Sequence, residues 1–216
     1  PLTKVTNKHL LPIFNKPMIF YPLEFLIKTG HKKILIITNP DDNLLYKKLI
    51  KNYFNEKIIF LSQKKPIGIP DAYNLASKYI KNKKTTLILG DNIFYPYDNF
   101  TINNISTNTI FLKKVLNPND YGVAKVIKNK LSVIVEKPKK LISNFAITGL
   151  YCFNEGVEMM IKDLKPSKRN ELEIIDLIKL FHKKKEINFK ILNNNIFWRD
   201  CGSFQNILEC SNYFAK

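Results

Sequence analysis

The sequence predicts an α/β fold in which a sheet of parallel strands is flanked by helices. Three observations support this prediction. Strand and helix patterns alternate in the order β-α-β-α-β between Lys32 and Leu89, and parallel neighbours require crossover connections of this kind. The strand segments are apolar on both faces, as in sheets that helices cover on both sides. The second half of the chain is richer in strand patterns, which indicates further strands beyond this unit.

Hydrophobic periodicity places the elements of the first half. Strands are predicted at KKILIIT, KIIFL and TTLIL, which are Lys32–Thr38, Lys57–Leu61 and Thr85–Leu89. A helix is predicted over Asn43–Phe54 because apolar residues recur there at helical spacing, with Asp41 or Asp42 as its N-cap. A second helix is predicted over Asp71–Ile80, where the apolar residues gather on one side.

The second half carries four strand patterns and three helix patterns. The strands are predicted at Thr109–Lys113, Gly122–Ile127, Leu131–Val135 and Phe145–Phe153. The helices are predicted at Glu155–Lys162, Glu171–Lys184 and Ser203–Phe214. The sequence contains no internal repeat, low-complexity linker or change of composition that indicates a boundary. We therefore expect residues 1–216 to form a single domain.

Composition favours a soluble, cytoplasmic protein with no membrane partner. The chain has 216 residues, of which 45% are hydrophobic and 25% charged, as in ordinary globular proteins. No apolar run approaches the roughly 20 residues needed to span a bilayer, and no signal peptide is recognisable. Cys152, Cys201 and Cys210 are odd in number and lack CxxC spacing, which argues against a disulfide framework and a zinc site.

The formal net charge of +17 raises the question of nucleic-acid binding. A polynucleotide-binding module is expected to gather its basic residues on one face. Here the basic residues are almost all lysines, and they are scattered along the chain. We therefore interpret the charge as solvated surface and expect no nucleic-acid partner, with a nucleic-acid-binding module as the alternative class.

An acid follows the third predicted strand, in LILGDNIFY. Asp91 lies just beyond the carboxyl end of that strand, and open parallel sheets bind their ligands at this edge. A half-buried carboxylate is costly unless a partner compensates it, and a divalent metal is one such partner. Alternatively, Asp91 caps the turn Asn92–Phe94 by accepting backbone hydrogen bonds.

A second acid occurs in a similar context, in WRDCGS. Asp200 also follows a short apolar segment, and it precedes a glycine and the predicted helix N-cap Ser203. Two carboxylates at strand-to-helix junctions can converge on one rim of the sheet. Magnesium commonly takes only one or two protein carboxylates, so Asp91 and Asp200 suffice for a magnesium site.

Seven blocks of the chain, in this order, resemble sugar-phosphate nucleotidylyltransferases, most closely the glucose-1-phosphate thymidylyltransferases. They are PLTKVTNKHLLPIFNKPMIFYPLE, LGDNIFY, DYGVAKV, EKP, SNFAITGLYCF, LKPSKRNELEIID and WRDCGS. The resemblance implies a Rossmann-like nucleotide-binding fold with a mixed, mostly parallel sheet flanked by helices, and a smaller sugar-binding part. It also implies a homo-oligomeric enzyme for the full-length protein.

For the full-length protein, the implied reaction transfers a nucleotidyl group from dTTP to glucose 1-phosphate, giving dTDP-glucose and pyrophosphate with Mg²⁺ as cofactor. Uridylyl or cytidylyl transfer to a sugar phosphate stays open as an alternative. A non-catalytic relative that binds sugar nucleotides is a further alternative.

The resemblance implies roles for individual residues. Asp91 and Asp200 match the magnesium-binding pair, while Lys8 and Lys137 match catalytic lysines that face the triphosphate and the sugar phosphate. The remaining implied contacts are with the pyrimidine base (Gln63 and Gly68, with Pro66 between them), with phosphate (Arg169), with the sugar phosphate (Glu136, beside Lys137) and with the sugar (Gly122, Asn144, Thr148, Gly149 and Tyr151).

One family signature is missing from the sequence. A glycine-rich loop of the form GGxGTRL normally follows the first strand and cradles phosphates, and the chain begins at Pro1-Leu2-Thr3, which resembles the residues just after that loop. We therefore expect a fragment, truncated at both ends, that lacks the first strand of its sheet. Loss of a central strand would leave the neighbouring strand edges without backbone partners.

Overall fold

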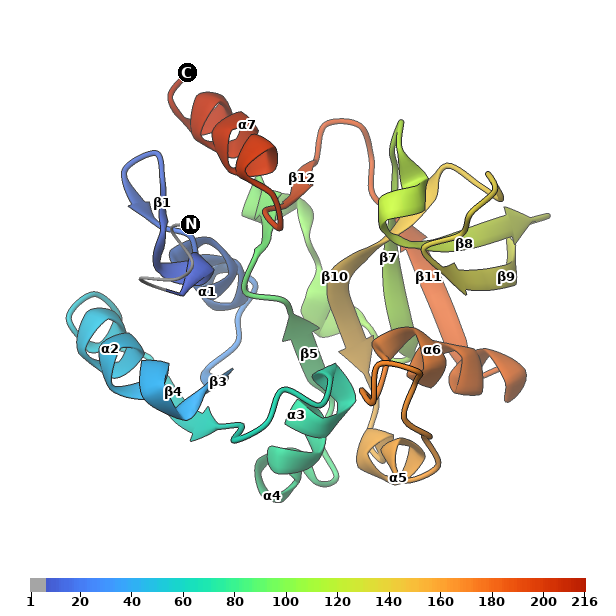
Figure 1. Cartoon of the computed structure of the whole chain (residues 1–216), viewed down its shortest axis with the longest axis horizontal. Coiled ribbons are helices and arrows are strands. Elements are labelled where there is room, and N and C mark those ends of the chain that lie inside the picture. The colour runs from blue at the N-terminus through green and yellow to red at the C-terminus, as the bar shows by residue number, and fades with distance from the viewer. Residues whose placement is uncertain (1–6) are drawn as a thin grey trace.

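The structure is a computed structural model that describes residues 7–216. The segment Pro1-Leu2-Thr3, expected to follow the phosphate loop, lies outside this range. Strands occupy the middle of the molecule and helices pack around them (Figure 1). The expected α/β fold with a mixed sheet flanked by helices is confirmed.

The first parallel pair forms as predicted. Strand β3 (Lys33–Thr38) and strand β4 (Lys57–Ser62) are parallel and joined by helix α2 (Pro40–Lys51). The prediction that Asp41 or Asp42 caps α2 is wrong, because the N-cap is Asn39 and Pro40 occupies the first turn. Proline suits the first helical position, where no amide hydrogen is needed. The two aspartates lie in the first turn, where negative charge complements the helix dipole.

The helix predicted over Asp71–Ile80 is divided in two. Helix α3 (Ile69–Leu75) and helix α4 (Ser77–Ile80) meet at Ala76, whose ψ of −5° departs from helical geometry. Helix α3 begins directly after Gly68, with Pro70 in its first turn. Its early start brings the first turn close to the end of β4.

The larger sheet is built around one long strand. Strand β10 (Phe145–Phe153) is antiparallel to β5 (Thr85–Ile88), β7 (Asn108–Lys114) and β8 (Gly122–Ile127), and β8 pairs in turn with β9 (Lys130–Glu136). Strand β11 (Ile187–Ile191), which was not predicted, is parallel to β7. The sheet is therefore mixed, but antiparallel ladders outnumber the parallel ones among the described residues because β10 runs against three of its neighbours.

A cavity separates the two groups of strands. Within residues 7–216, β3 pairs only with β4, and β5 pairs only with β10. A cavity of 640 Å³ lies between β3 and β5, lined by residues 34–38 and 85–89 and by side chains of α3 and of helix α1 (Phe20–Lys28). Figure 1 shows β3 and β4 on one side and β5 at the centre.

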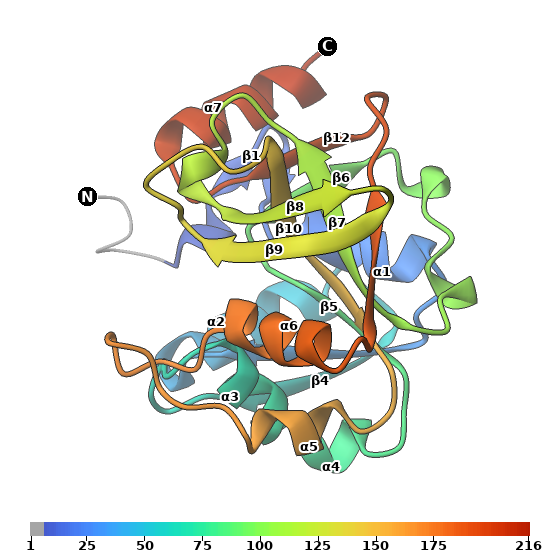
Figure 2. The same ribbon diagram turned by 90° about the vertical axis from the view of Figure 1, so that its right-hand side faces the viewer.

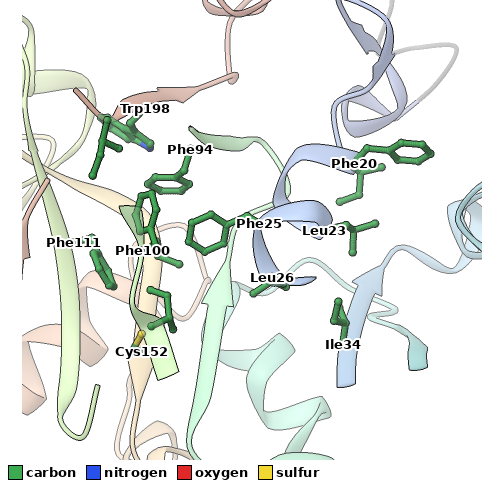
Figure 3. Packing of buried hydrophobic residues seen from close by; sticks show 14 of the residues in the cluster. Phe20, Leu23, Phe25, Leu26, Ile34, Phe94, Phe100, Phe111, Cys152 and Trp198 are labelled. Atoms are coloured by element: carbon green, nitrogen blue, oxygen red, sulfur yellow. The ribbon is translucent and has the colours of Figure 1, made fainter. Parts of the chain in front are cut away.

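An unpredicted helix anchors the strand that follows Asp91. Helix α1 (Phe20–Lys28) places Phe25 against Phe94 and Phe100, with ring centroids 5.5 and 4.8 Å apart (Figure 3). Phe94 belongs to β6 (Asn92–Tyr95), and Trp198 packs in the same cluster. This aromatic core fixes β6, and with it the position of the preceding Asp91.

The remaining elements complete the two ends of the molecule. Strand β12 (Phe197–Asp200) runs antiparallel to β6 and leads to helix α7 (Phe204–Phe214), and the short strands β1 (Pro12–Ile13) and β2 (Lys16–Pro17) form a hairpin. Helices α5 (Val157–Ile161) and α6 (Ile174–Lys183) lie on the face seen in Figure 2, below the β8–β9 hairpin. None of the helices within residues 7–216 has the length and apolar character to cross a membrane.

Candidate active site

Asp91 lies beyond the end of β5 and has two side-chain partners. Its side chain is 15% exposed, and its Oδ2 atom is 2.5 Å from Lys8 Nζ. Its Oδ1 atom accepts a hydrogen bond of 3.0 Å from Asn92 Nδ2. The alternative, in which Asp91 caps the following turn through backbone bonds, finds no such bond among the described residues. The carboxylate is instead bound by the ammonium group of Lys8 and by the side-chain carboxamide of Asn92.

The charge on Asp91 is maintained by Lys8. Burial favours the protonated acid, but the Lys8 ammonium, through its charge and its hydrogen bond, outweighs burial and lowers the pKa of Asp91. Lys8 lies in a short 3-10 helix, Lys8–Leu10, whose N-cap Asn7 accepts a hydrogen bond from the His9 amide. Asp91 is therefore an ionised, half-buried acid beside a cation.

Asp200 lies next to Asp91 in space although it is distant in sequence. The antiparallel β6–β12 ladder pairs Asp200 with Asn92, and the Cys201 amide donates a hydrogen bond of 2.7 Å to the Asp91 carbonyl. Asp200 Oδ1 accepts a hydrogen bond of 2.8 Å from the Gly202 amide. The predicted N-cap is confirmed, since Ser203 Oγ accepts from an amide in the first turn of α7.

The surroundings of Asp200 disfavour its ionised carboxylate, which a nearby positive charge would stabilise. Burial, followed by the negative charge of Asp91, raises the pKa of Asp200 to about 6, while the ammonium groups of Lys8 and Lys137 act in the opposite direction. Two lysines and two carboxylates therefore influence one another across a small region. A carboxylate pair of this kind suits a divalent cation.

The donor set also limits which cation fits. Among residues 7–216, His, Cys, Asp and Glu side chains form no group of three or more that could hold a metal. A cation bound by Asp91 and Asp200 would take its other ligands from water and substrate oxygens. Magnesium tolerates this arrangement, whereas structural zinc requires four protein ligands.

Glu136 and Lys137 lie at the end of β9 and line a second cavity of 470 Å³. Lys137 has a φ of +41°, and its amide donates a hydrogen bond of 3.0 Å to the Tyr121 carbonyl. Gly122 lies opposite, where a Cβ atom would come within 2.6 Å of Ile175 Cδ1 and 3.1 Å of Glu136 Oε2. A side chain at position 122 would therefore clash with Ile175 and crowd the Glu136 carboxylate.

Arg169 lines the same cavity from the loop before α6. Its guanidinium is exposed and donates hydrogen bonds of 2.9 and 3.0 Å to the two carboxylate oxygens of Glu173. A bidentate pair holds the planar guanidinium in one orientation. Arg169, Glu136 and Lys137 are thus brought together at one opening.

Gln63 and Gly68 lie near the larger cavity. Gln63 Nε2 donates hydrogen bonds to the Gly68 carbonyl (3.2 Å) and to Asp71 Oδ2 (2.7 Å). Gly68 has a φ of +110°, and a Cβ atom there would lie 2.0 Å from the Leu172 carbonyl oxygen. The loop after β4 is therefore shaped by a glycine that no other residue can replace without a clash.

The predicted sugar-pocket residues of β10 occupy different environments. Thr148 is fully buried and donates a hydrogen bond of 3.0 Å to the Phe111 carbonyl, and Asn144 is exposed before the start of the strand. Tyr151 is buried against Phe153, yet burial followed by the charges of Glu136, Asp200 and Asp91 raises its pKa. Thr148 and Tyr151 are therefore buried in the core, whereas Asn144 is exposed.

Two side chains beside Asp91 were not among the predicted site residues. They are Asn92, in the motif LGDNIFY, and Trp198, in the motif WRDCGS. In the structure, Asn92 Oδ1 accepts a hydrogen bond of 2.9 Å from Trp198 Nε1. The sequence holds no local signal for this contact, because the two residues are 106 positions apart.

Comparison with known proteins connects this geometry to one family. Residues 1–216 match the sequence model of the nucleotidyl transferase family. Glucose-1-phosphate thymidylyltransferase of Neisseria meningitidis (serogroup A, serotype 4A) is 35% identical over 99% of this chain and 77% of that protein. The enzyme of the same name from Mycolicibacterium smegmatis is 33% identical over 99% of this chain and 76% of that protein.

Solved structures agree with this relationship. A Bacillus anthracis structure provisionally assigned as glucose-1-phosphate thymidylyltransferase, in complex with sucrose, has a TM-score of 0.88 and 32% identity, covering 99% of this chain and 88% of that chain. UDP-glucose pyrophosphorylase complexed with UDP-glucose has a TM-score of 0.87 at 24% identity, covering 100% of this chain and 92% of that chain, and so shares the fold. The chain belongs to the nucleotidyl transferase family.

Proposed function

We propose that the protein transfers a thymidylyl group from dTTP to glucose 1-phosphate, giving dTDP-glucose and pyrophosphate. The observation that carries this proposal is the geometry that brings Lys8, Asp91 and Asp200 together. Lys8 Nζ lies 2.5 Å from Asp91 Oδ2, and the β6–β12 ladder places Asp200 opposite Asn92, next to Asp91. The names of the relatives support dTTP and glucose 1-phosphate as the substrates.

The reaction is an in-line displacement at phosphorus. A phosphate oxygen of glucose 1-phosphate attacks the α-phosphorus of dTTP, the bond to the bridging oxygen of the β-phosphate breaks, and pyrophosphate leaves. No proton transfer is required, so catalysis depends on orientation and on positive charge around the phosphates. A magnesium ion held by Asp91 and Asp200 would neutralise phosphate charge.

The lysines and the neighbouring polar groups orient the two substrates in this proposal. The Lys8 side chain is 34% exposed, so its ammonium can exchange the Asp91 carboxylate for a phosphate oxygen of the nucleotide. Lys137 and Arg169, at the smaller cavity, bind the phosphate of the sugar. Gln63, beside Gly68, faces the base with a carboxamide whose orientation Asp71 restrains.

Pyrophosphate release from dTTP, UTP and CTP, each with glucose 1-phosphate and Mg²⁺, tests the assignment. We expect dTTP to be the best substrate. Asp91→Ala and Asp200→Ala should each lower kcat on the order of 10²-fold or more, and Asp163→Ala, at an exposed aspartate of the loop after α5, should not. Activity that survives either site substitution would reject the metal assignment.

The same assay separates the alternatives. Preference for UTP or CTP would reassign the base. Binding of dTDP-glucose without pyrophosphate release from any nucleotide would support a non-catalytic relative that keeps the sugar-nucleotide pocket.

A further inference from the structure

Asn92 connects three strands directly beside Asp91. Its side chain is 1% exposed and uses both ends of its carboxamide. Oδ1 accepts hydrogen bonds of 2.9 Å from the Gly149 amide and 2.9 Å from Trp198 Nε1, and Nδ2 donates one of 3.0 Å to Asp91 Oδ1. The partners belong to β10, to β12 and to the turn before β6.

The two donors fix the orientation of the carboxamide. Because Gly149 N and Trp198 Nε1 can only donate, the oxygen of Asn92 must face them and the NH₂ group must face Asp91. An indole buried to 2% exposure cannot turn away, and it packs against Tyr121 at a centroid distance of 5.3 Å. The direction of the Asn92–Asp91 bond is therefore set by the core and not by solvent.

The backbone of β10 is shaped around the same side chain. The β10–β7 register shifts between Ile147 and Tyr151, and Gly149 lies inside this irregular stretch. A Cβ atom at position 149 would lie 2.5 Å from Asn92 Cγ. Glycine at 149 thus allows the amide to reach Asn92 while leaving room for the carboxamide.

We propose that Asn92 is a positioning residue that fixes the Asp91 carboxylate for cation binding. The inference rests on the proposed function, in which Asp91 and Asp200 hold the metal. With Oδ1 of Asp91 bound to Asn92, the carboxylate keeps Oδ2 directed toward Lys8. Asn92 does not touch substrate, because both ends of its carboxamide are used within the protein. Mutation of a residue that supports a metal-binding side chain typically weakens metal affinity by about 10- to 100-fold.

Asn108 provides a matched control. It is also buried, at 7% exposure, and also bridges segments: its Oδ1 accepts from the Asn154 amide at 2.8 Å and its Nδ2 donates to the Glu186 carbonyl at 2.9 Å. It lies at the start of β7, away from the acids. Asn92→Ala and Asn108→Ala therefore remove comparable buried hydrogen bonds, and only the first affects Asp91.

The test measures Mn²⁺ binding to the chain by the electron paramagnetic resonance signal of free Mn²⁺, together with thermal unfolding and the kinetics of pyrophosphate release. Both variants should lower the melting temperature. Asn92→Ala should weaken Mn²⁺ binding about tenfold or more and lower kcat more than it changes KM for glucose 1-phosphate. Asn108→Ala should keep wild-type Mn²⁺ affinity.

A third variant, Asp91→Ala, separates the two levels of the proposal. If Asp91→Ala abolishes Mn²⁺ binding and Asn92→Ala binds Mn²⁺ like Asn108→Ala, the positioning role is refuted and the metal assignment stands. If Asp91→Ala binds Mn²⁺ normally, the metal assignment falls and the role of Asn92 falls with it. Should Asn92→Ala not fold, Trp198→Phe removes one donor to Asn92 and should weaken Mn²⁺ binding a few-fold; wild-type affinity there would refute the inference.

Discussion

The Lys8 ammonium lies 2.5 Å from Asp91 Oδ2 and lowers the pKa of this carboxyl group. In the proposed site, the same ammonium would compete with a metal ion for Asp91 Oδ2. Because Lys8 is also proposed to bind the triphosphate, metal binding and catalysis should respond differently to its removal.

Lys8→Met removes the charge and keeps most of the side-chain volume. We expect kcat to fall on the order of 10²-fold, the usual effect of losing a charge that stabilises the transition state. Mn²⁺ affinity of the chain should stay equal or increase, because the competing ammonium is gone. Steady-state kinetics and Mn²⁺ titration check the two effects separately.

Lys16→Met is the matched control for that prediction. Lys16 Nζ is also 2.5 Å from a carboxylate, Glu24 Oε2, and is similarly half-exposed. The Lys16→Met substitution should change neither Mn²⁺ affinity nor kcat. A parallel loss of Mn²⁺ binding in Lys8→Met would contradict the competition.

Gly68 should be far less tolerant of substitution than Gly156. Both have positive φ, +110° and +86°, but a Cβ at Gly68 would lie 2.0 Å from the Leu172 carbonyl oxygen, whereas Gly156 has no neighbour within 4 Å. Gly156→Ala should lower the free energy of unfolding by about 1–2 kcal/mol, the cost of the left-handed conformation. Gly68→Ala should cost clearly more in urea unfolding and should weaken dTTP binding, because Gln63 bonds to the Gly68 carbonyl. Equal losses in the two variants would refute the role of the Leu172 contact.

Strands with continuous apolar runs could be predicted from the sequence, and the rule that ligands bind at strand ends was enough to expect Asp91 and Asp200 on one rim. Helix α1 was not predicted from the sequence because it is apolar almost all round and contains Pro22 in its first turn. Because apolar residues occupy most of its positions, the segment lacks the broad polar face that marks a surface helix in a sequence. The pairing of β6 with β12 was not predicted because strands of four residues are too short to show a clear hydrophobic pattern.

The role of Asn92 could not be predicted because its partners are remote. Gly149 and Trp198 come next to it only after β10 and β12 have assembled. A single sequence contains no local signal for contacts of this range. Asp91 and Asp200 could be proposed as site residues from the sequence, whereas the contacts of Asn92 are known only from the folded structure.

Arg169 should control binding of the sugar phosphate more than turnover. Its guanidinium is held by Glu173 at the cavity that Glu136 and Lys137 line. Arg169→Ala should raise KM for glucose 1-phosphate about tenfold, since a hydrogen bond to a charged group contributes about 1.5–3 kcal/mol, while kcat changes less.

The ion pair Lys16–Glu24 offers the control for Arg169, because neither residue lines the smaller cavity. Lys16→Ala breaks this pair and should leave KM unchanged. A rise of KM for dTTP alone in Arg169→Ala would place the arginine on the nucleotide instead.

The three cysteines should be unreactive in the native protein despite being free. Cys152, Cys201 and Cys210 are all buried, and burial raises the pKa of Cys152 to about 11. The hydrogen bond between Cys201 and Cys210, whose Sγ atoms are 3.2 Å apart, and then burial raise the pKa of Cys201. Because only the thiolate attacks a disulfide reagent, the raised pKa values of Cys152 and Cys201 leave few thiolates at these two residues at pH 8. Burial keeps the reagent away from all three cysteines.

Titration with a chromogenic aromatic disulfide at pH 8 checks this expectation. The native chain should release no chromophore on the time scale of minutes, and the urea-unfolded chain should release three equivalents, one for each cysteine in the sequence. Raising the pH toward 11 in the native state should increase the rate, because the thiolate of Cys152 becomes populated as the pH reaches its pKa. Fast release of one equivalent from the native chain at pH 8 would show that a thiol is exposed by local opening, and would contradict the packing of α7 against β12.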